Sequence, residues 1–441
     1  MALVPANSLH RHDEASEPAR ADTRKLSNTM AINDGGQLSL SSRAQRPDPG
    51  QPRSPPVEIW ERIVDELAEG YRYREYALWD YGRVCRAWFL RCRFHAQRGL
   101  ALSNRRQVHS FARMTEVDPC RREAVRMVRI DDHIDILGPF SATMAQKLPR
   151  VEMLTLRGGR WKLGQMHCQI FLQVSAAFQS ITVLVLYETG FPSVAIFGRL
   201  VAALPHLTNL ICWDLKFKSS TFTLGCVHLP KSLALSRLEL QGSSEVIEFL
   251  TTTSICATLR CIALKDCNEV LGPVYQRLVD LARTSLSSVD IRPSPHSGDW
   301  QDIPLDLSIV ENLEMISLHL SFHQLSQQSS TPAAILSRVS PAKLREVKIT
   351  TYSFDLDECL LEGLFGAFDE SRAQVDQILS GPRYTALTAV TFELLACIHL
   401  ADIRKVPTAK EWRAHLISAF PELHAKQLLR TPVMVRIREM V

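Results

Sequence analysis

The sequence predicts an α/β protein in which a short N-terminal three-helix module precedes a curved solenoid of stacked strand–helix units. Three observations lead to this expectation: a short apolar segment that recurs along the chain, helical periodicity between its copies, and amphipathic segments before the first copy. With 441 residues, of which 46% are hydrophobic and 22% charged, the chain is able to bury a substantial core.

The recurring segment has the form apolar-x-x-apolar-x-apolar. Successive copies start 24 to 31 residues apart, and the last one follows after 43 residues. Such an interval holds one strand and one helix, and a single unit cannot bury its own apolar face. We therefore expect neighbouring units to stack, with parallel strands on the concave face and helices on the convex face. The copies begin at Val125, Val151, Ile181, Leu207, Leu235, Leu259, Leu286, Leu313, Leu344 and Leu387.

The stretches between the copies have helical periodicity, as in VAALPHL, VIEFLTTTSICATL and VYQRLVDLARTSL. These stretches and the strands define a predicted solenoid over residues 125–400. Residues 401–441 are expected to cap it, because apolar residues recur at helical spacing before Pro421, and the final VMVRI is able to add a strand. The cap helix is built on Trp412, Leu416, Ile417 and Phe420.

The N-terminal part divides into three predicted segments. Residues 1–53 are rich in Pro, Ser, Arg, Asp and Gln, and we expect a disordered tail because such a composition buries too little apolar surface. Residues 54–92 form a helical module, and residues 93–124 hold connecting helices. The expected helix stripes are Ile59, Trp60, Ile63, Val64 and Leu67, then Tyr81, Val84, Cys85, Trp88, Phe89 and Cys92, and then Val108, Phe111 and Thr115.

Two motifs in the helical module resemble those of an F-box. Pro56-Val57-Glu58-Ile59 stands at a helix start, and Val84-Cys85-Arg86-Ala87-Trp88 follows on the next helical segment. The chain as a whole looks like the large fungal class of F-box proteins. The repeats resemble irregular leucine-rich repeats, in which the usual Asn or Cys after the strand occurs only as Cys267, so the turns must satisfy their backbone groups in another way.

The F-box resemblance implies a function. In that family the helices dock on a Skp-type adaptor, which joins a cullin scaffold in an SCF-like ubiquitin ligase, and the repeats hold a target protein for degradation. Exposed apolar side chains are suited to such docking, and Trp is a favoured anchor. The expected adaptor-binding residues are Pro56, Ile59, Ile63, Val84 and Trp88.

Positions on the predicted strands also indicate candidate residues for target binding. Side chains at alternate strand positions are expected to point into or beside the concavity. They are candidates only, since charged side chains on a surface need no function. The candidates are Arg157, Glu188, Asp214, Glu239, Lys265, Asp290, His319 and Lys348.

No catalytic pattern occurs in the sequence. The span Gly159–Gly164 has the outer glycines of a phosphate-binding loop, but Gln165 and Met166 stand where Lys and Ser or Thr are required. We therefore expect a protein that is not an enzyme and uses no cofactor or metal. The alternative to the ubiquitin-ligase reading is a non-catalytic repeat scaffold without that role.

Charge and cysteine content bear on partners and location. Between Arg83 and Arg129 lie twelve arginines and three acidic residues, a charge of +9 within a net charge of +4. This stretch suits a solvated face or an acidic protein partner, and nucleic acid is a further alternative that we do not expect. Eleven cysteines without a C-x-x-C pair, no signal-like start and no membrane-length apolar run favour the cytoplasm or nucleus.

Overall fold

A computed structural model describes residues 56–70, 78, 80–162, 168–219, 227–267, 271–293, 305–321, 331–353 and 369–437. The chain divides into two units, residues 1–55 and 56–441, and the fold described below belongs to the second. The predicted disordered tail, residues 1–53, lies outside the described residues.

One long parallel sheet forms the centre of this unit. In the described part of the chain it has thirteen strands, each paired with its neighbour in chain order, except that the last two both pair with β13. All ten predicted repeat segments lead into strands of this sheet, from β2 to β13. The strands are β1 (Gly99–Leu102), β2 (Met127–Asp131), β3 (Met153–Arg157), β4 (Val183–Tyr187), β6 (Asn209–Trp213), β8 (Arg237–Gln241), β9 (Cys261–Cys267), β10 (Ser288–Pro293), β11 (Met315–Ser321), β12 (Glu346–Ser353), β13 (Ala389–Ile398), β14 (Leu429–Arg430) and β15 (Val433–Ile437).

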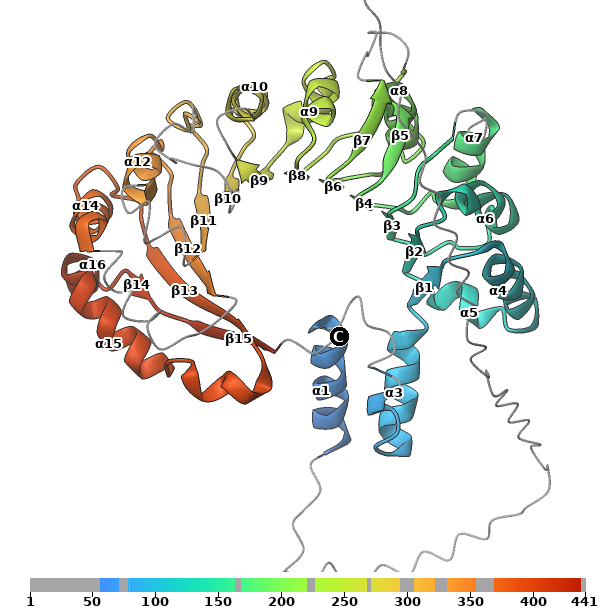
Figure 1. The fold of residues 1–441 in the computed structure, drawn as a ribbon, viewed down its shortest axis with the longest axis horizontal. Helices are drawn as coiled ribbons and strands as arrows, with labels where there is room; N and C mark the ends of the chain where they lie inside the picture. The colour runs from blue at the N-terminus through green and yellow to red at the C-terminus, as the bar shows by residue number, and fades with distance from the viewer. Residues whose placement is uncertain are drawn as a thin grey trace, which may run out of the picture. The chain divides into compact units, whose positions relative to one another are not determined.

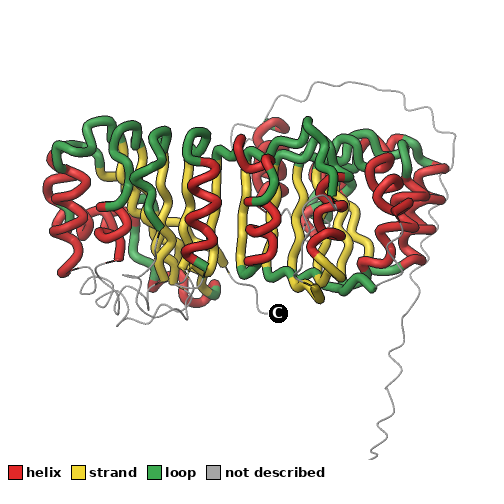
Figure 2. Tube along the Cα trace, turned by 90° about the horizontal axis from the view of Figure 1, so that it is seen from above, coloured by secondary structure: helices red, strands yellow, loops and turns green. Residues whose placement is uncertain are grey.

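Helices cover the outer face of the sheet, and its other face is turned to the inside of the curve (Figure 1). Seen from above, the strands run side by side, and the loops lie at the two ends of the strands and helices (Figure 2). This is the strand–loop–helix order that the repeat predicts. The outer elements are α4 (Arg105–Val117), α5 (Cys120–Ala124), η1 (Ile134–Ile136), α6 (Leu137–Met144), α7 (Cys168–Ala177), α8 (Val194–Ala202), α9 (Ser244–Thr251), η2 (Ser254–Thr258), α10 (Gly272–Ala282), α12 (Thr331–Ser337), α14 (Asp369–Ser380), η4 (Leu400–Lys405), α15 (Ala409–Ala419) and α16 (Pro421–Ala425).

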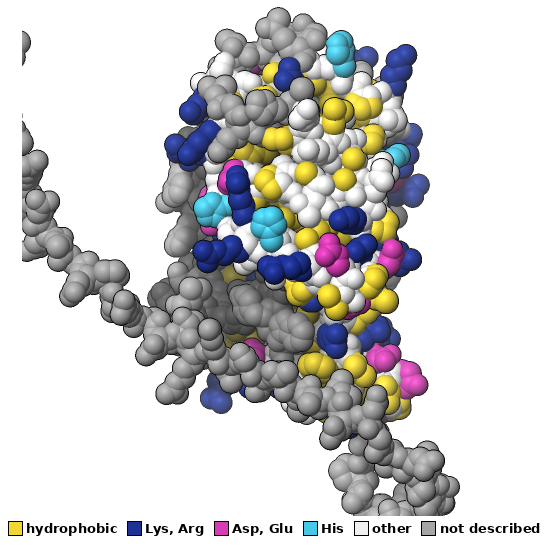
Figure 3. Space-filling view, turned by 90° about the vertical axis from the view of Figure 1, so that its right-hand side faces the viewer, with side chains coloured by type: hydrophobic (Ala, Val, Ile, Leu, Met, Phe, Trp, Pro, Cys, Tyr) yellow, Lys and Arg dark blue, Asp and Glu magenta, His cyan; other side chains and the backbone are white. Residues whose placement is uncertain are grey.

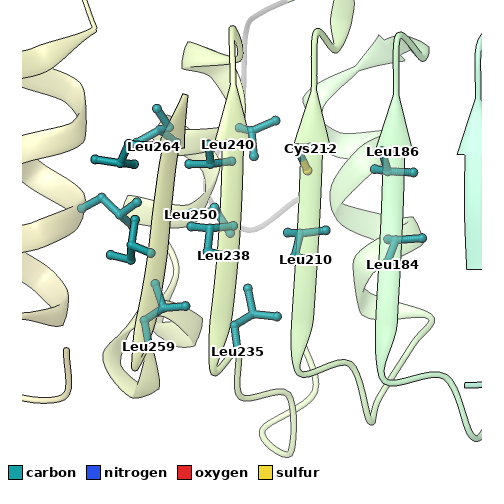
Figure 4. Packing of buried hydrophobic residues seen from close by; sticks show 14 of the residues in the cluster. Leu184, Leu186, Leu210, Cys212, Leu235, Leu238, Leu240, Leu250, Leu259 and Leu264 are labelled. Carbon is teal, nitrogen blue, oxygen red and sulfur yellow. The ribbon is translucent and has the colours of Figure 1, made fainter. Parts of the chain in front are cut away.

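The core is built from equivalent positions of successive units. Each strand directs two alternate side chains towards the helices, such as Leu184 and Leu186 of β4 and Leu238 and Leu240 of β8, and all four are fully buried (Figure 4). Parallel register sets Leu184 beside Leu210 and Leu210 beside Leu238. Each unit therefore completes the core of its neighbour, as the stacking argument requires.

The sheet begins earlier than the repeat pattern predicts. Residues 93–124 were expected to hold only connecting helices, but β1 pairs in parallel with β2 over all four of its residues. The segment GLAL is too short to contain the apolar-x-x-apolar-x-apolar pattern. The third predicted helix exists as α4, yet it buries Val108 and Phe111 in the solenoid core, so it belongs to the outer layer and not to the N-terminal module.

A second, two-stranded parallel sheet lies beyond the strand ends of the first. It pairs β5 (Gly190–Ser193) with β7 (Lys216–Ser219) and is extended by a bridge between Arg160 and Gly190. Beneath it the rings of Phe191, Phe197 and Phe217 pack against one another, with centroids 5.7 to 6.1 Å apart. The repeat pattern did not predict these strands, because they follow the periodic segment.

A left-handed residue lies at or just beyond the end of the strand in six successive units. In the first of these, the N–H of Asp132 donates to the carbonyl of Arg157 at 2.7 Å, and the N–H of Glu188 donates to Trp213 at 2.8 Å in the third. A backbone ladder thus replaces the side-chain ladder whose absence the sequence indicates. These left-handed residues are Asp132, the pair Gly158 and Gly159, Glu188, Asp214, Gly242 and, within β9, Asp266.

Two glycines in these turns should respond differently to substitution. Gly159 has φ +74°, and an added Cβ would lie 2.6 Å from the carbonyl oxygen of Asp132, whereas Gly242 has φ +61° and meets the movable Oδ1 of Asp214 at 2.7 Å. We expect Gly242→Ala to lower the free energy of unfolding by about 1 to 2 kcal/mol and Gly159→Ala by more, because a backbone carbonyl does not rotate away. Urea unfolding measures both, and equal losses would contradict the steric argument.

Candidate functional site

Two packed helices form most of the described part of the N-terminal module, α1 (Val57–Gly70) and α3 (Arg86–Ala96). Among its described residues Val64, Leu78, Cys92 and Ala96 form a buried core, and Ala68, Tyr81 and Trp88 pack against them partly buried. The ring of Trp88 lies 5.6 Å from that of Trp60, centroid to centroid. Several apolar side chains of the pair lie outside this core.

A charged network joins the two helices. Arg91 donates from Nε and Nη2 to the two carboxylate oxygens of Asp65, each at 2.6 Å, and His95 Nε2 lies 2.7 Å from Oδ1. These hydrogen bonds, first those from Arg91 and then that from His95, lower the pKa of Asp65 from 3.8 to about 2. A bidentate arginine fixes the relative orientation of its partners as well as their distance.

The Asp65 carboxyl is therefore expected to titrate near pH 2 in an NMR pH series. The charged form makes the pairing, so its stabilising contribution is present above the unfolded pKa, 3.8, and is lost as the pH falls through about 2. Arg91→Gln should move the titration midpoint towards 3.8, while Arg93→Gln, on the same helix but exposed, should leave it in place. An Asp65 titration midpoint that stays the same in Arg91→Gln would contradict the pairing.

The five predicted adaptor-binding residues fall into two groups. Pro56, Ile59, Ile63 and Val84 are exposed, with Ile59 at 50% and Val84 at 65%. Trp88 is half-buried in the packing of the helix pair itself. Val84 and Cys85 precede α3, because Cys85 is its N-cap, so the predicted helical stripe through Val84 begins only at Trp88.

Further apolar residues of this surface were not singled out from the sequence. Leu90 and Phe94 are exposed although they lie in α3, and they line a groove of about 380 Å³ together with Trp60 and Trp88. We call the exposed apolar side chains of the pair the helix-pair face. Its described members are Val57, Ile59, Ile63, Val84, Phe89, Leu90 and Phe94.

The inner side of the sheet brings several predicted target-binding residues together. Lys265 Nζ lies 2.6 Å from Glu239 Oε1 and 3.5 Å from the ring centroid of Trp213. The Trp213 ring meets Tyr187 edge to face at 5.6 Å, and Arg157 lies over Tyr187 at 5.3 Å. We call these five residues the inner cluster. Its aromatic members were missed from the sequence, because the residues that follow them, Glu188 and Asp214, were assigned to the inward positions.

A second polar group lies further along the inner side. His319 Nε2 lies 3.2 Å from Asp290 Oδ2 and 3.3 Å from Ser317 Oγ, and Lys348 Nζ pairs with Glu393 at 2.9 Å. Burial alone would raise the pKa of Asp290, but the hydrogen bond and charge of His319 outweigh it and lower that pKa. Ser317 and Asp290 approach the same nitrogen of His319, so the three do not form a proton relay.

Glu188 and Asp214 take a different place from the other inner-side candidates. Both are left-handed turn residues beyond the strand ends, where they line a depression of about 580 Å³ together with Arg160 and Lys216. The expected strand alternation fails for them, since Tyr187 and Trp213 occupy the last inward positions. Burial, and then the charges of Asp266 and Glu188, raise the pKa of Asp214.

The arginine-rich stretch is partly neutralised by neighbours. Arg105 pairs with Asp135 at 3.6 Å, Arg126 with Glu152 at 3.7 Å and Arg129 with Asp131 at 2.9 Å. On the face seen in Figure 3, basic side chains lie interspersed with acidic and hydrophobic ones. This mixture differs from the continuous basic surface by which proteins commonly follow a phosphate backbone.

The described residues also bear on other classes of site. Within them no group of three or more His, Cys, Asp or Glu side chains is placed to hold a metal ion. No helix of the described ranges is long and apolar enough to cross a membrane. The cysteines found there are free thiols, and burial raises the pKa of Cys256 and Cys267 to about 12.

Comparison with known proteins identifies no family. No protein-family model matches the chain, and no curated protein matches it. Among solved structures, the chain is similar to one titled "Crystal structure of TLR13-ssRNA13 complex", with 10% sequence identity and a TM-score of 0.21. The similarity covers 72% of this chain and 57% of that chain, and so weak a superposition carries no inference about function.

Proposed function

We propose that this protein recruits a target to a cullin-type ubiquitin ligase. The helix pair binds a Skp-type adaptor, and the inner side of the solenoid binds the target protein. The observation that carries the proposal is the helix-pair face, a set of exposed apolar side chains on α1, on α3 and just before α3. Among the described residues, the core between these helices holds four buried side chains. The F-box-like motifs at Pro56–Ile59 and Val84–Trp88 give this face its expected partner.

Exposed apolar side chains on a small helical element favour a protein partner. Burying a side chain such as Ile59 or Val84 from water contributes about 1.5 to 3 kcal/mol. The groove between Trp60, Trp88 and Phe94 offers space for a side chain of the partner. The Asp65–Arg91–His95 network holds the two helices in one orientation, which lowers the cost of ordering the face on binding.

The inner side of the sheet supports the second half of the proposal. The inner cluster includes Tyr187, Trp213 and Arg157, residue types that are enriched where proteins bind proteins. These side chains project from paired strands of one sheet, so they are held rigidly relative to one another. A rigid surface of this kind suits recognition of a preformed partner.

The test is binding of the full chain to a purified Skp-type adaptor, measured by calorimetry. We expect Ile59→Asp and Ile63→Asp each to weaken binding about 30-fold or more, as loss of a central anchor does. Val117→Asp is the control, since Val117 is also an exposed apolar residue but lies on α4. Circular dichroism should show all three variants folded.

Failure of the folded wild-type chain to bind the adaptor would overturn the ubiquitin-ligase role. Adaptor binding that survives both Asp substitutions would overturn the assignment of the helix-pair face. A target captured through the inner cluster without adaptor binding would instead favour the scaffold alternative. Substituting Trp213 with Ala tests that surface separately, because it removes a ring from the inner cluster without touching the helix pair.

A further inference from the structure

The sheet ends at an edge strand, β15. It pairs in parallel with β13, setting Val433 beside Leu394 and Val435 beside Ala396. Among the strands described, none pairs with its other edge. The N–H of Leu394 donates to the carbonyl of Pro432 at 3.0 Å, and backbone direction alternates along a strand. The N–H and C=O groups of Val433, Val435 and Ile437 therefore point away from β13.

The side chains of this edge are apolar and exposed. Met434, Val435 and Ile437 are 53%, 43% and 47% exposed. Natural sheets protect such edges with charges, prolines or bulges, because free backbone groups beside apolar side chains invite another strand. Within β15, Arg436 is the one charged residue. The outer edge of β15 is therefore able to accept a further strand.

The sequence of β15 fits a second copy of itself in antiparallel orientation. With Val435 opposite its own copy, Val433 faces Ile437 and Met434 faces Arg436. One face of the pair is then wholly apolar, and on the other the stem of Arg436 covers Met434 with no like charges opposed. The hydrogen-bonded pairs of this register use the outward backbone groups of Val433, Val435 and Ile437.

Other two-fold registers fit less well. Centring the pair on Arg436 would set two positive charges directly opposite each other. Centring it on Met434 would leave Ile437 without a partner inside the strand. We propose that two copies of this chain form a dimer by antiparallel pairing of their β15 edges about a two-fold axis at Val435. This isologous contact is closed, so it forms a dimer and not an open chain of copies.

Light scattering on the purified full chain tests the proposal. At micromolar concentration we expect wild type to have about twice the 49.7 kDa mass of one chain. Val435→Lys sets two cations face to face at the axis and should raise the dimer dissociation constant ~100-fold, returning the mass to that of one chain. Leu172→Lys is the matched control: it adds the same charge at an exposed leucine of α7 and should remain dimeric.

Disulfide trapping tests the register. Opposed Cα atoms of a hydrogen-bonded antiparallel pair lie about 5.5 Å apart, within reach of a disulfide. Mild oxidation should therefore crosslink Val435→Cys to its own copy, whereas Val433→Cys, which faces Ile437, should not exceed the background of a chain with its eleven native cysteines. The double variant Val433→Cys, Ile437→Cys should crosslink.

Two results would contradict the proposal, one for the dimer itself and one for its register. A wild-type chain of single-chain mass would overturn it, including the case in which the edge accepts a strand of another protein. Equal crosslinking of Val433→Cys and Val435→Cys would overturn the register. If Val435→Lys proved unfolded by circular dichroism, the wild-type mass and the crosslinking pattern would still decide the proposal.

Discussion

Phe197→Ala is expected to lower the free energy of unfolding by about 3 to 5 kcal/mol. Phe197 is fully buried in α8, and its ring packs against Phe191, Phe217 and Phe249 with centroids 5.5 to 6.1 Å apart. Those three rings come from β5, β7 and α9. The cavity left by removing the Phe197 ring would therefore weaken packing in several units together. Because solenoid stability depends on contacts between neighbouring units, the loss should spread beyond its own repeat.

Urea unfolding followed by circular dichroism measures this loss. Leu172→Ala is the control, since Leu172 is an exposed residue of α7 and its truncation should change stability by less than about 0.5 kcal/mol. A Phe197→Ala chain as stable as the control would mean that the aromatic cluster does not hold the second sheet to the helices.

Lys265→Ala should destabilise the solenoid by about 3 to 5 kcal/mol, because it leaves the Glu239 carboxylate buried without its partner. The two side chains lie 2.6 Å apart at their charged ends and are each only 12% exposed. Arg150→Ala, which breaks the exposed 3.1 Å pair with Glu123, should cost less than about 1 kcal/mol. Calorimetric unfolding of the two variants compares them directly.

Replacing both partners distinguishes a buried charge from lost packing. The double variant Lys265→Met, Glu239→Leu should recover most of the stability, since apolar groups of similar size replace a buried pair at little cost. Recovery would be absent if Lys265 acted mainly through its contact with Trp213.

The same pair has a pH signature. Burial lowers the pKa of Lys265 below 10.5, against the opposing charge of Glu239. Between the folded pKa and 10.5 the unfolded chain binds more protons, so stability should rise with pH in that window. Glu239→Gln removes the carboxylate that favours the charged lysine, and the Lys265 pKa should fall further in an NMR titration.

The repeat half of the fold was predictable because one physical constraint recurs. Every unit must bury the same alternate side chains, so Leu238 and Leu240 repeat the pattern of Leu184 and Leu186. β1 was not predicted from this pattern, because it ends the sheet and is four residues long. The β5–β7 sheet was not predicted either, because its pairing depends on turns outside the periodic segment.

The surface residues were predictable only in part. The exposure of Ile59 and Val84 follows from their motifs, whereas the exposure of Leu90 and Phe94 depends on which face of α3 meets α1. Glu239 and Lys265 follow from strand alternation, but their contact and the position of Trp213 depend on register across three strands. Side-chain neighbours from distant units are a property of stacking, which no single segment encodes.

The left-handed turns make the repeat tolerant of variation in length. Four of these turns tie the strand end to the next strand through a backbone hydrogen bond, as Asp214 does with Gln241 at 3.0 Å, so the register is set there before the connecting segment begins. Insertions between such a turn and the next buried apolar residue then alter the rim without shifting the sheet. The units that these four turns close start 26 to 30 residues apart. Such a chain can lengthen its loops, and change what they bind, while its strands stay in register.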